Sequence, residues 1–193
     1  MDKNIEKNKF NILDGKAERV AKRLLGCILE RKINGKAIKV KIVETESYGE
    51  RDPASHSYKG ETKRNKVMFG KSGHLYVYFT YGMHYCANIV VGKEGQGEAV
   101  LLRSVEPILG ENIMIKNRGG IRGKSLCNGP GKLCKALGIE IKLNGHNLAS
   151  NPLKLLIKEP LNKSRIIQTT RIGITKNKEA LLRFHYHTQG YPV

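Results

Sequence analysis

The sequence has no long hydrophobic run. Its first 15 residues contain no apolar stretch of the kind a signal peptide requires, and no segment reaches the roughly eighteen apolar residues of a membrane span. No internal repeat or low-complexity linker interrupts the 193 residues. These absences predict a cytoplasmic protein with no membrane partner. We expect a single domain over residues 1–193, with a flexible start over residues 1–14.

Cysteine is scarce and scattered. The four cysteines show neither C-x-x-C pairing nor zinc-finger spacing. In a reducing cytosol such thiols are usually buried small hydrophobic side chains. We therefore expect no disulfide, no metal site and no cofactor. The four residues are Cys27, Cys86, Cys127 and Cys134.

Acidic residues are half as common as basic ones. Lys and Arg total 35 against 17 Asp and Glu, which gives a net charge of +18 and a pI near 9.9. The basic residues extend from Lys3 to Arg183, so the charge belongs to the folded body and not to a tail. Such a protein attracts polyanions, although a lysine-rich soluble protein without that partner has the same composition.

Periodicity predicts a mixed α/β (α+β) fold with a mostly antiparallel, curved β-sheet and flanking helices. Apolar residues recur at helical spacing over residues 16–31, and Asn34-Gly35 precedes an alternating strand at 36–44. Residues 49–73 carry charge and glycine without periodicity, which indicates a functional loop. A helix is expected over residues 107–116. Further strand patterns, the first three forming an antiparallel meander, occupy residues 74–81, 84–91, 98–106, 153–159, 165–174 and 181–187.

Two glycine-containing segments are candidate phosphate contacts. Residues 117–124, "NRGGIRGK", form either a solvated loop or a phosphate-binding loop, and we favour the second. The next segment predicts a short helix with Asn128 as N-cap, Pro130 in the first turn and Gly138 as the stop. Its first amides lie beside Lys132, an arrangement that binds phosphate well.

Tyrosine is concentrated in "LYVYFTYGMHYC", which holds four of the eight tyrosines. In an extended strand Tyr76 and Tyr78 share a face, while Leu75, Val77 and Phe79 point to a core on the other. Such rings often simply cover a sheet. Combined with the positive charge, they also resemble a nucleic-acid-binding surface. Bases stack on aromatic rings, and a side chain inserted as a wedge holds a base stack open.

The segment "VETESY" contains two carboxylates in a protein whose net charge is strongly positive. Alternation puts Glu44, Glu46 and Tyr48 on one side of a strand. Either a glutamate here pairs with a surface lysine, or it is a general base in a partly dry pocket.

These residues resemble the alkyladenine, or 3-methyladenine, DNA glycosylases of the mammalian alkyladenine type, and the chain looks like a bacterial member. The resemblance spans residues 15–186 and rests on the order and spacing of its motifs. They are "IVETESYGERDPASHSYKGETKRNKVMF", "GHLYVYFTYGMHYCANIV", "EAVLLRSVEP", "NGPGKLCKALGI" and "RIGI". The resemblance implies a monofunctional enzyme that flips damaged purines out of duplex DNA and hydrolyses the N-glycosidic bond, leaving an abasic site.

The resemblance also assigns catalytic and base-binding roles. Glu46 matches the carboxylate that activates water, and Arg103 matches the residue that holds water and carboxylate in position. Tyr48, His56 and Tyr78 match the pocket around the flipped base, in which cationic alkylpurines stack well on electron-rich rings.

Other matched residues concern discrimination and DNA contact. Asn88 matches a residue that crowds the exocyclic amine of undamaged guanine. Tyr81 matches the wedge that fills the hole left by the flipped nucleotide. Arg64 and Lys132 are candidate contacts to the DNA backbone, while Asn65, in the same motif as Arg64, either touches DNA or fixes its loop.

The expected partner is double-stranded DNA that contains damaged purines, bound by a monomer. Candidate lesions are 3-methyladenine, 7-methylguanine, hypoxanthine and ethenoadenine. A non-catalytic basic nucleic-acid-binding domain would use the same charge and rings without needing Glu46. A metal-dependent nuclease would need clustered carboxylates, of which Glu44 and Glu46 are the available pair.

Overall fold

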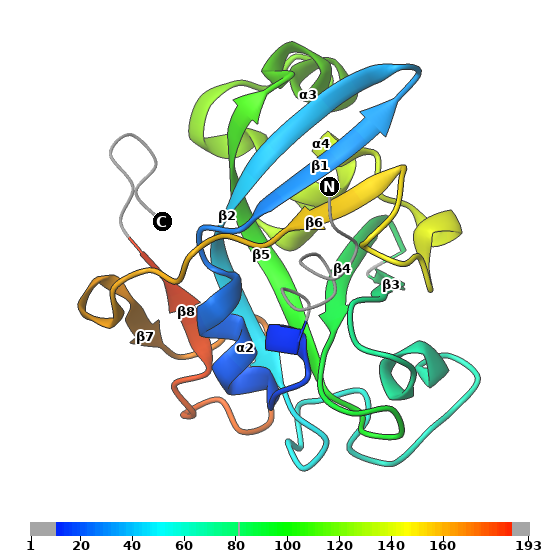
Figure 1. Cartoon of the computed structure of the whole chain (residues 1–193), viewed down its shortest axis with the longest axis vertical. Coiled ribbons are helices and arrows are strands. Elements are labelled where there is room, and N and C mark those ends of the chain that lie inside the picture. The colour runs from blue at the N-terminus through cyan, green and yellow to red at the C-terminus, as the bar shows by residue number, and fades with distance from the viewer. Residues whose placement is uncertain (1–10, 81, 187–193) are drawn as a thin grey trace.

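The backbone is organised around one antiparallel sheet. The computed structural model describes residues 11–80 and 82–186. Within them the strands pair in the order β3-β4-β5-β2-β1-β6, while β8 pairs with β2 and β7. The sheet is curved and helices flank it (Figure 1), which confirms the predicted mixed α/β class and the β3-β4-β5 meander. The strands are β1 (Ile28–Ile33), β2 (Lys36–Tyr48), β3 (Leu75–Thr80), β4 (His84–Val90), β5 (Ala99–Leu109), β6 (Leu153–Leu156), β7 (Ile167–Thr169) and β8 (Arg183–His185).

Strand β2 is the longest, with 13 residues, and it changes neighbours along its length. Asn34 and Gly35 both have positive φ, so they form the tight turn that joins β1 to the first half of β2. The second half, Glu44 to Glu46, pairs instead with β8, while β5 runs along the opposite edge. The carboxyl end of β2 is therefore held on both sides.

The first helix, α2 (Ala17–Leu24), is shorter than the predicted segment 16–31. Leu25 is already extended and Gly26 has a φ of +83°, a conformation that leaves the helix. The apolar residues beyond that turn belong to strand β1. The helical prediction was therefore wrong over residues 25–31, because a glycine turn divides a pattern that is apolar on both sides.

The other helices are α3 (Glu111–Asn117) and α4 (Pro130–Leu137). Contrary to the expectation of a helix from Pro107, that proline lies inside β5, and α3 begins after Gly110 at φ +78°. Helix α4 ends at Gly138 in the left-handed conformation, as predicted. Its N-cap is Gly129 and not Asn128. Short 3-10 turns occur at Asn11–Leu13, Lys66–Phe69, Gly123–Leu126, Ile141–Leu143 and Lys163–Arg165.

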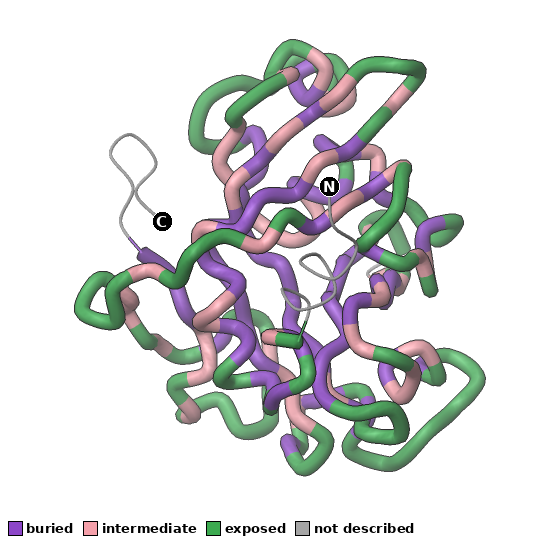
Figure 2. Tube along the Cα trace, in the orientation of Figure 1, coloured by how far each residue is buried: buried purple, intermediate pink, exposed green. Residues whose placement is uncertain are grey.

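The core lies between the sheet and its helices. Figure 2 shows the buried stretches concentrated on the strands of the sheet and the exposed ones on the connecting segments. Leu13 is completely buried in this core. All four cysteines are free and buried, as predicted for small hydrophobic side chains.

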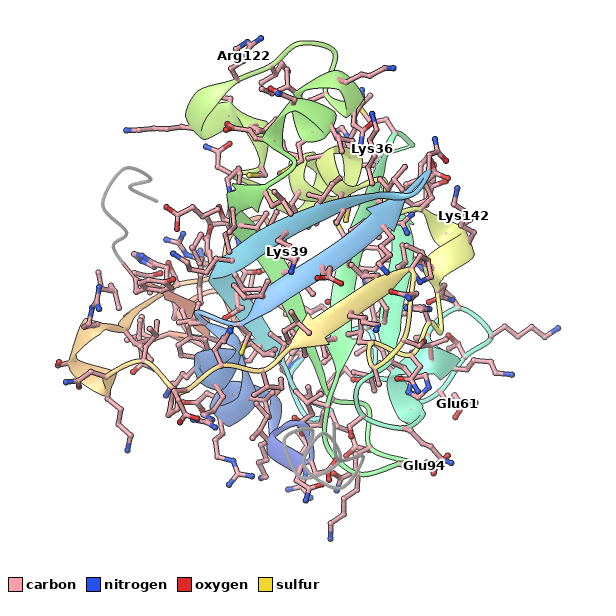
Figure 3. All side chains as sticks on the ribbon, turned by 45° about the horizontal axis from the view of Figure 1, so that its top comes forward. Lys36, Lys39, Glu61, Glu94, Arg122 and Lys142 are labelled. Atoms are coloured by element: carbon pink, nitrogen blue, oxygen red, sulfur yellow. The ribbon has the colours of Figure 1, made fainter. Side chains whose placement is uncertain are left out.

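Charged side chains are distributed over separate parts of the surface. Figure 3 labels Lys36 at the start of β2, Arg122 before the third 3-10 turn and Lys142 in the fourth. The positive charge therefore belongs to several elements of the folded body. Among the described residues, no helix has the length and apolar character needed to cross a membrane.

Candidate active site

A cavity of about 610 Å³ opens where the carboxyl end of β2 meets strands β3 to β5. Its wall combines aromatic rings, two arginines, an amide side chain and the backbone of two loops. Five predicted site residues line it together, although they come from segments far apart in the sequence. These are Tyr48, His56, Tyr78, Asn88 and Arg103, and Arg64 joins them at the rim.

Glu46 is completely buried next to this cavity. Its Oε1 atom accepts hydrogen bonds from the backbone N–H of Ile172 at 2.9 Å and pairs with Arg103 Nη1 at 3.2 Å. Its Oε2 atom accepts one hydrogen bond, from the Tyr48 hydroxyl at 2.8 Å. A carboxylate oxygen has two lone pairs, so Oε2 retains capacity for a further donor such as water.

Arg103 joins the two carboxylates of the "VETESY" segment. Its Nε atom donates to Glu44 Oε1 at 3.2 Å, and Arg183 Nη1 donates to the same oxygen at 2.8 Å. The pairing of β2 with β5 skips Val43 on one strand and Arg103 on the other. Such bulges redirect side chains, which brings Arg103 toward both glutamates.

The Tyr48 ring lies between the cavity and a second arginine. Burial, with the neighbouring Glu46 carboxylate, raises the pKa of the Tyr48 hydroxyl, so this group remains a hydrogen-bond donor at neutral pH. The guanidinium of Arg171 lies 4.7 Å from the centroid of the ring. Tyr48 therefore combines an apolar stacking surface with a fixed donor to Glu46.

Three further rings of the cavity wall cluster together, those of His56, Tyr76 and Tyr78. The centroid of His56 lies 4.6 Å from that of Tyr78, and His56 Nδ1 is 3.0 Å from the Tyr76 hydroxyl. Burial, reinforced by the charge of Arg64, lowers the pKa of His56. Burial also raises the pKa of Tyr78. The cluster is therefore uncharged at neutral pH, and Tyr76 within it is almost completely buried.

The amide side chains of Asn88 and Asn65 lie in different places, the first at the cavity wall and the second within a loop. Asn88 is buried at the cavity wall, where its Nδ2 donates to the Tyr76 carbonyl at 3.3 Å. Asn65 fixes its loop, because its Nδ2 donates to the carbonyls of His56 and Gly60 at 2.8 and 3.1 Å. These contacts, with Asn65 only 2% exposed, favour the loop-fixing role for this residue.

The expected DNA-facing residues are less completely described. Tyr81 lies outside the described residues. Arg64 is exposed, with its guanidinium 5.7 Å from the Tyr78 ring centroid, and Lys132 Nζ donates to Asn128 at 2.8 Å. Phe79, expected in the core, is 48% exposed and packs on Tyr85, because the core contributed by β3 ends before it.

Sequence reasoning missed the ion pair between Arg171 and Asp52. Both residues belong to motifs that carried the resemblance, but the two are 119 positions apart. An arginine inside the strand-like segment "RIIQTTRIGI" was the available signal, since a buried arginine needs an acidic partner.

No group of three or more His, Cys, Asp and Glu side chains suited to a metal ion occurs among residues 11–80 and 82–186. Glu44 and Glu46 instead have arginine partners. The paired glutamates are thus engaged in a charge-balanced cluster with Arg103 and Arg183.

Comparisons with known proteins all indicate the same family. The family model for methylpurine-DNA glycosylase matches residues 11–190. A protein of Carboxydothermus hydrogenoformans named "Putative 3-methyladenine DNA glycosylase" is 50% identical over 173 residues, covering 89% of this chain and 91% of the relative. Relatives of the same name from Methanoculleus marisnigri and Nitrosospira multiformis are 49% and 44% identical, covering 89% and 86% of this chain and 91% and 82% of their own lengths.

Proposed function

The chain belongs to the methylpurine-DNA glycosylase family, and we propose that it is a monofunctional DNA-repair glycosylase that removes damaged purines from duplex DNA. The proposed substrates are 3-methyladenine, 7-methylguanine, hypoxanthine and ethenoadenine. The enzyme acts as a monomer in the cytoplasm, and at the nucleoid if its host is a bacterium.

The observation that carries this proposal is the buried Glu46 carboxylate beside an aromatic cavity. Oε2 has only the Tyr48 hydroxyl as a described donor. A water bound there can give its proton to Oε2 while its oxygen attacks the sugar C1′. The C1′–O bond forms as the N-glycosidic bond breaks, and the base leaves with that electron pair.

Arg103 has a positioning role in this scheme. It fixes Oε1 through a 3.2 Å contact, so Oε2 is left for the Tyr48 hydroxyl and, in the proposed mechanism, for the attacking water. The fixed negative charge of the carboxylate also stabilises the oxocarbenium-like sugar as the base departs. No lysine needs to form a Schiff base, so the product is an intact strand with an abasic site.

The rings of Tyr48, His56 and Tyr78 provide the recognition surface. A flipped purine stacks on such rings, and the positive charge of an alkylated base strengthens the attraction. Asn88 narrows the cavity on one side, so we propose that it excludes the exocyclic amine of normal guanine. This is discrimination by a poor fit of the wrong base.

Duplexes that each carry one defined lesion, incubated with the protein and then cleaved with alkali, test the proposal. Strand cleavage only after alkali, and only in the lesion-containing strand, is the expected result. The matched control is Glu46→Gln, which keeps the shape of the side chain. Tight binding without cleavage of any lesion by the wild-type protein would instead favour a non-catalytic DNA-binding domain.

A further inference from the structure

The Arg171–Asp52 ion pair is buried behind the proposed base pocket. Arg171 uses Nη1 and Nη2 to bind both oxygens of Asp52, with Nη2 and Oδ1 3.0 Å apart. The Arg171 side chain is fully buried and that of Asp52 is 7% exposed. Burial acts to raise the pKa of Asp52, but hydrogen bonds from Arg171 and Asn177 outweigh it and hold the pKa below its usual value. Asp52 is therefore charged at neutral pH.

Arg171 lies over the ring of Tyr48 without lining the cavity itself. Its guanidinium carbon lies 4.7 Å from the ring centroid, within the range of a cation–π interaction. Tyr48 lines the cavity, whereas Arg171 does not. The Tyr48 ring thus carries a fixed cation and also lines the cavity in which a purine would stack.

The same arginine also anchors the catalytic carboxylate. Its Nη1 atom donates to the Ser47 carbonyl at 2.9 Å, between Glu46 and Tyr48 in the strand. The next residue, Ile172, donates its backbone N–H to Glu46 Oε1 at 2.9 Å. A shift of Arg171 would therefore move the stacking ring and the carboxylate together.

We infer that the Arg171–Asp52 pair positions Tyr48 and Glu46 and sets the preference of the pocket between cationic and neutral damaged purines. This inference rests on the proposed glycosylase function. Arg171 is a positioning residue, because neither its position nor its contacts bring it to the reacting atoms.

The charge effect has a defined sign. A cation on one face of an aromatic ring reduces the attraction of the other face for a second cation, and the carboxylate of Asp52 partly offsets this. Removing the charge of Arg171 should favour cationic bases. Removing the charge of Asp52 leaves the arginine uncompensated and should favour neutral bases.

The test measures single-turnover excision of cationic 7-methylguanine and neutral hypoxanthine in one duplex context, and compares the ratio of the two rates. We expect Arg171→Met to raise the 7-methylguanine to hypoxanthine ratio, and Asp52→Asn to lower it, each by about threefold to tenfold. Arg31→Met is the matched control, because Arg31 is also buried but binds backbone carbonyls of Leu137 and Gly138. Its ratio should equal that of the wild type.

Equal ratios in the wild type, Arg171→Met and Asp52→Asn would overturn the specificity inference, even if all rates fell, since a purely structural role slows both lesions alike. If those two variants do not fold, Arg171→Lys decides. It keeps the charge but loses the two-pronged contact, so both rates should fall by about tenfold, while the ratio of the two rates and the affinity for undamaged duplex should stay those of the wild type, and a changed ratio would overturn the specificity inference. Unchanged rates would overturn the positioning role. Absence of excision by the wild type would refute the proposed function itself.

Discussion

Nη1 of Arg103 lies 3.2 Å from Oε1 of Glu46, and neither side chain is more than a tenth exposed. The same guanidinium also donates a hydrogen bond through Nε to Glu44. Because a guanidinium is planar and rigid, holding Glu44 and Glu46 with one arginine fixes the orientation of both carboxylates. The position of Oε2 of Glu46 is thereby defined before any substrate arrives.

The first prediction concerns these two carboxylates. Glu46→Gln should reduce single-turnover excision by at least about 10²-fold, because the amide keeps the shape and loses the base, while damaged-DNA binding stays nearly intact. Glu44→Gln is the matched variant and should slow excision less, since Glu44 acts through Arg103. Near-normal cleavage by Glu46→Gln would remove this residue from the mechanism.

The second prediction separates Tyr81 from Tyr78. If Tyr81 is a wedge, Tyr81→Ala should shift a paired lesion toward the stacked state and should have little effect opposite a gap, where no extrusion cost remains. Tyr78→Ala should lose discrimination for cationic bases in both duplexes. Single-turnover excision and lesion fluorescence measure the two effects. Equal slowing of paired and gapped substrates by Tyr81→Ala would assign that ring to the pocket.

The third prediction concerns the beginning of α4. Each neutralised phosphate contributes roughly 0.9 to the slope of log affinity against log salt. If Lys132 holds a phosphate, Lys132→Ala should lower this slope by about one in titrations of undamaged duplex. Lys36→Ala, at the β1–β2 turn, is the exposed control. An unchanged slope would make Lys132 a solvated side chain that binds Asn128.

The fourth prediction concerns the chemistry of the product. Excision should persist in excess chelator, and borohydride should trap no covalent complex between protein and DNA, because the proposed nucleophile is water activated by Glu46. Gel electrophoresis of the reaction under both conditions tests this. A trapped adduct, or activity that chelator removes and magnesium restores, would require a different mechanism.

The fifth prediction follows from the lowered pKa of His56, which burial causes and Arg64 reinforces. The usual pKa of histidine is about 6.5, so on acidification the unfolded chain takes up this proton before the folded chain. The free energy of unfolding should therefore fall as the pH drops from about 6.5 through the folded-state pKa. Denaturant unfolding across this window should show a flatter pH dependence for His56→Gln. The exposed His84→Gln is the control, and parallel curves for wild type and His56→Gln would contradict the prediction.

The alternation of apolar and polar residues, together with turn residues, predicted the strands around the pocket well. In a strand with one face on the core, buried side chains recur at every second position. The same reasoning failed where one local pattern continues across a turn, as at Gly26, or where a strand leaves the core, as at Phe79. The helix and strand propensities of the residues do not predict the turn at Gly26 or the exposure of Phe79, since both depend on what packs against the segment.

The grouping of Tyr48, His56, Tyr78 and Asn88 around one cavity required the family resemblance, because no local pattern relates residues on different elements. The role of Arg171 was harder to predict. Its partner Asp52 lies 119 residues away in sequence, and such pairing follows from the tertiary fold alone.

The alternation of side chains along β2 limits where residues can be inserted or deleted. Glu44, Glu46 and Tyr48 use one side of the strand, whereas Thr45 faces α2 and donates to the Ala21 carbonyl at 3.0 Å. Deleting one residue before Glu44 would exchange the two sides and send the carboxylates toward the helix. Insertions and deletions over evolution should therefore be absent from the second half of β2.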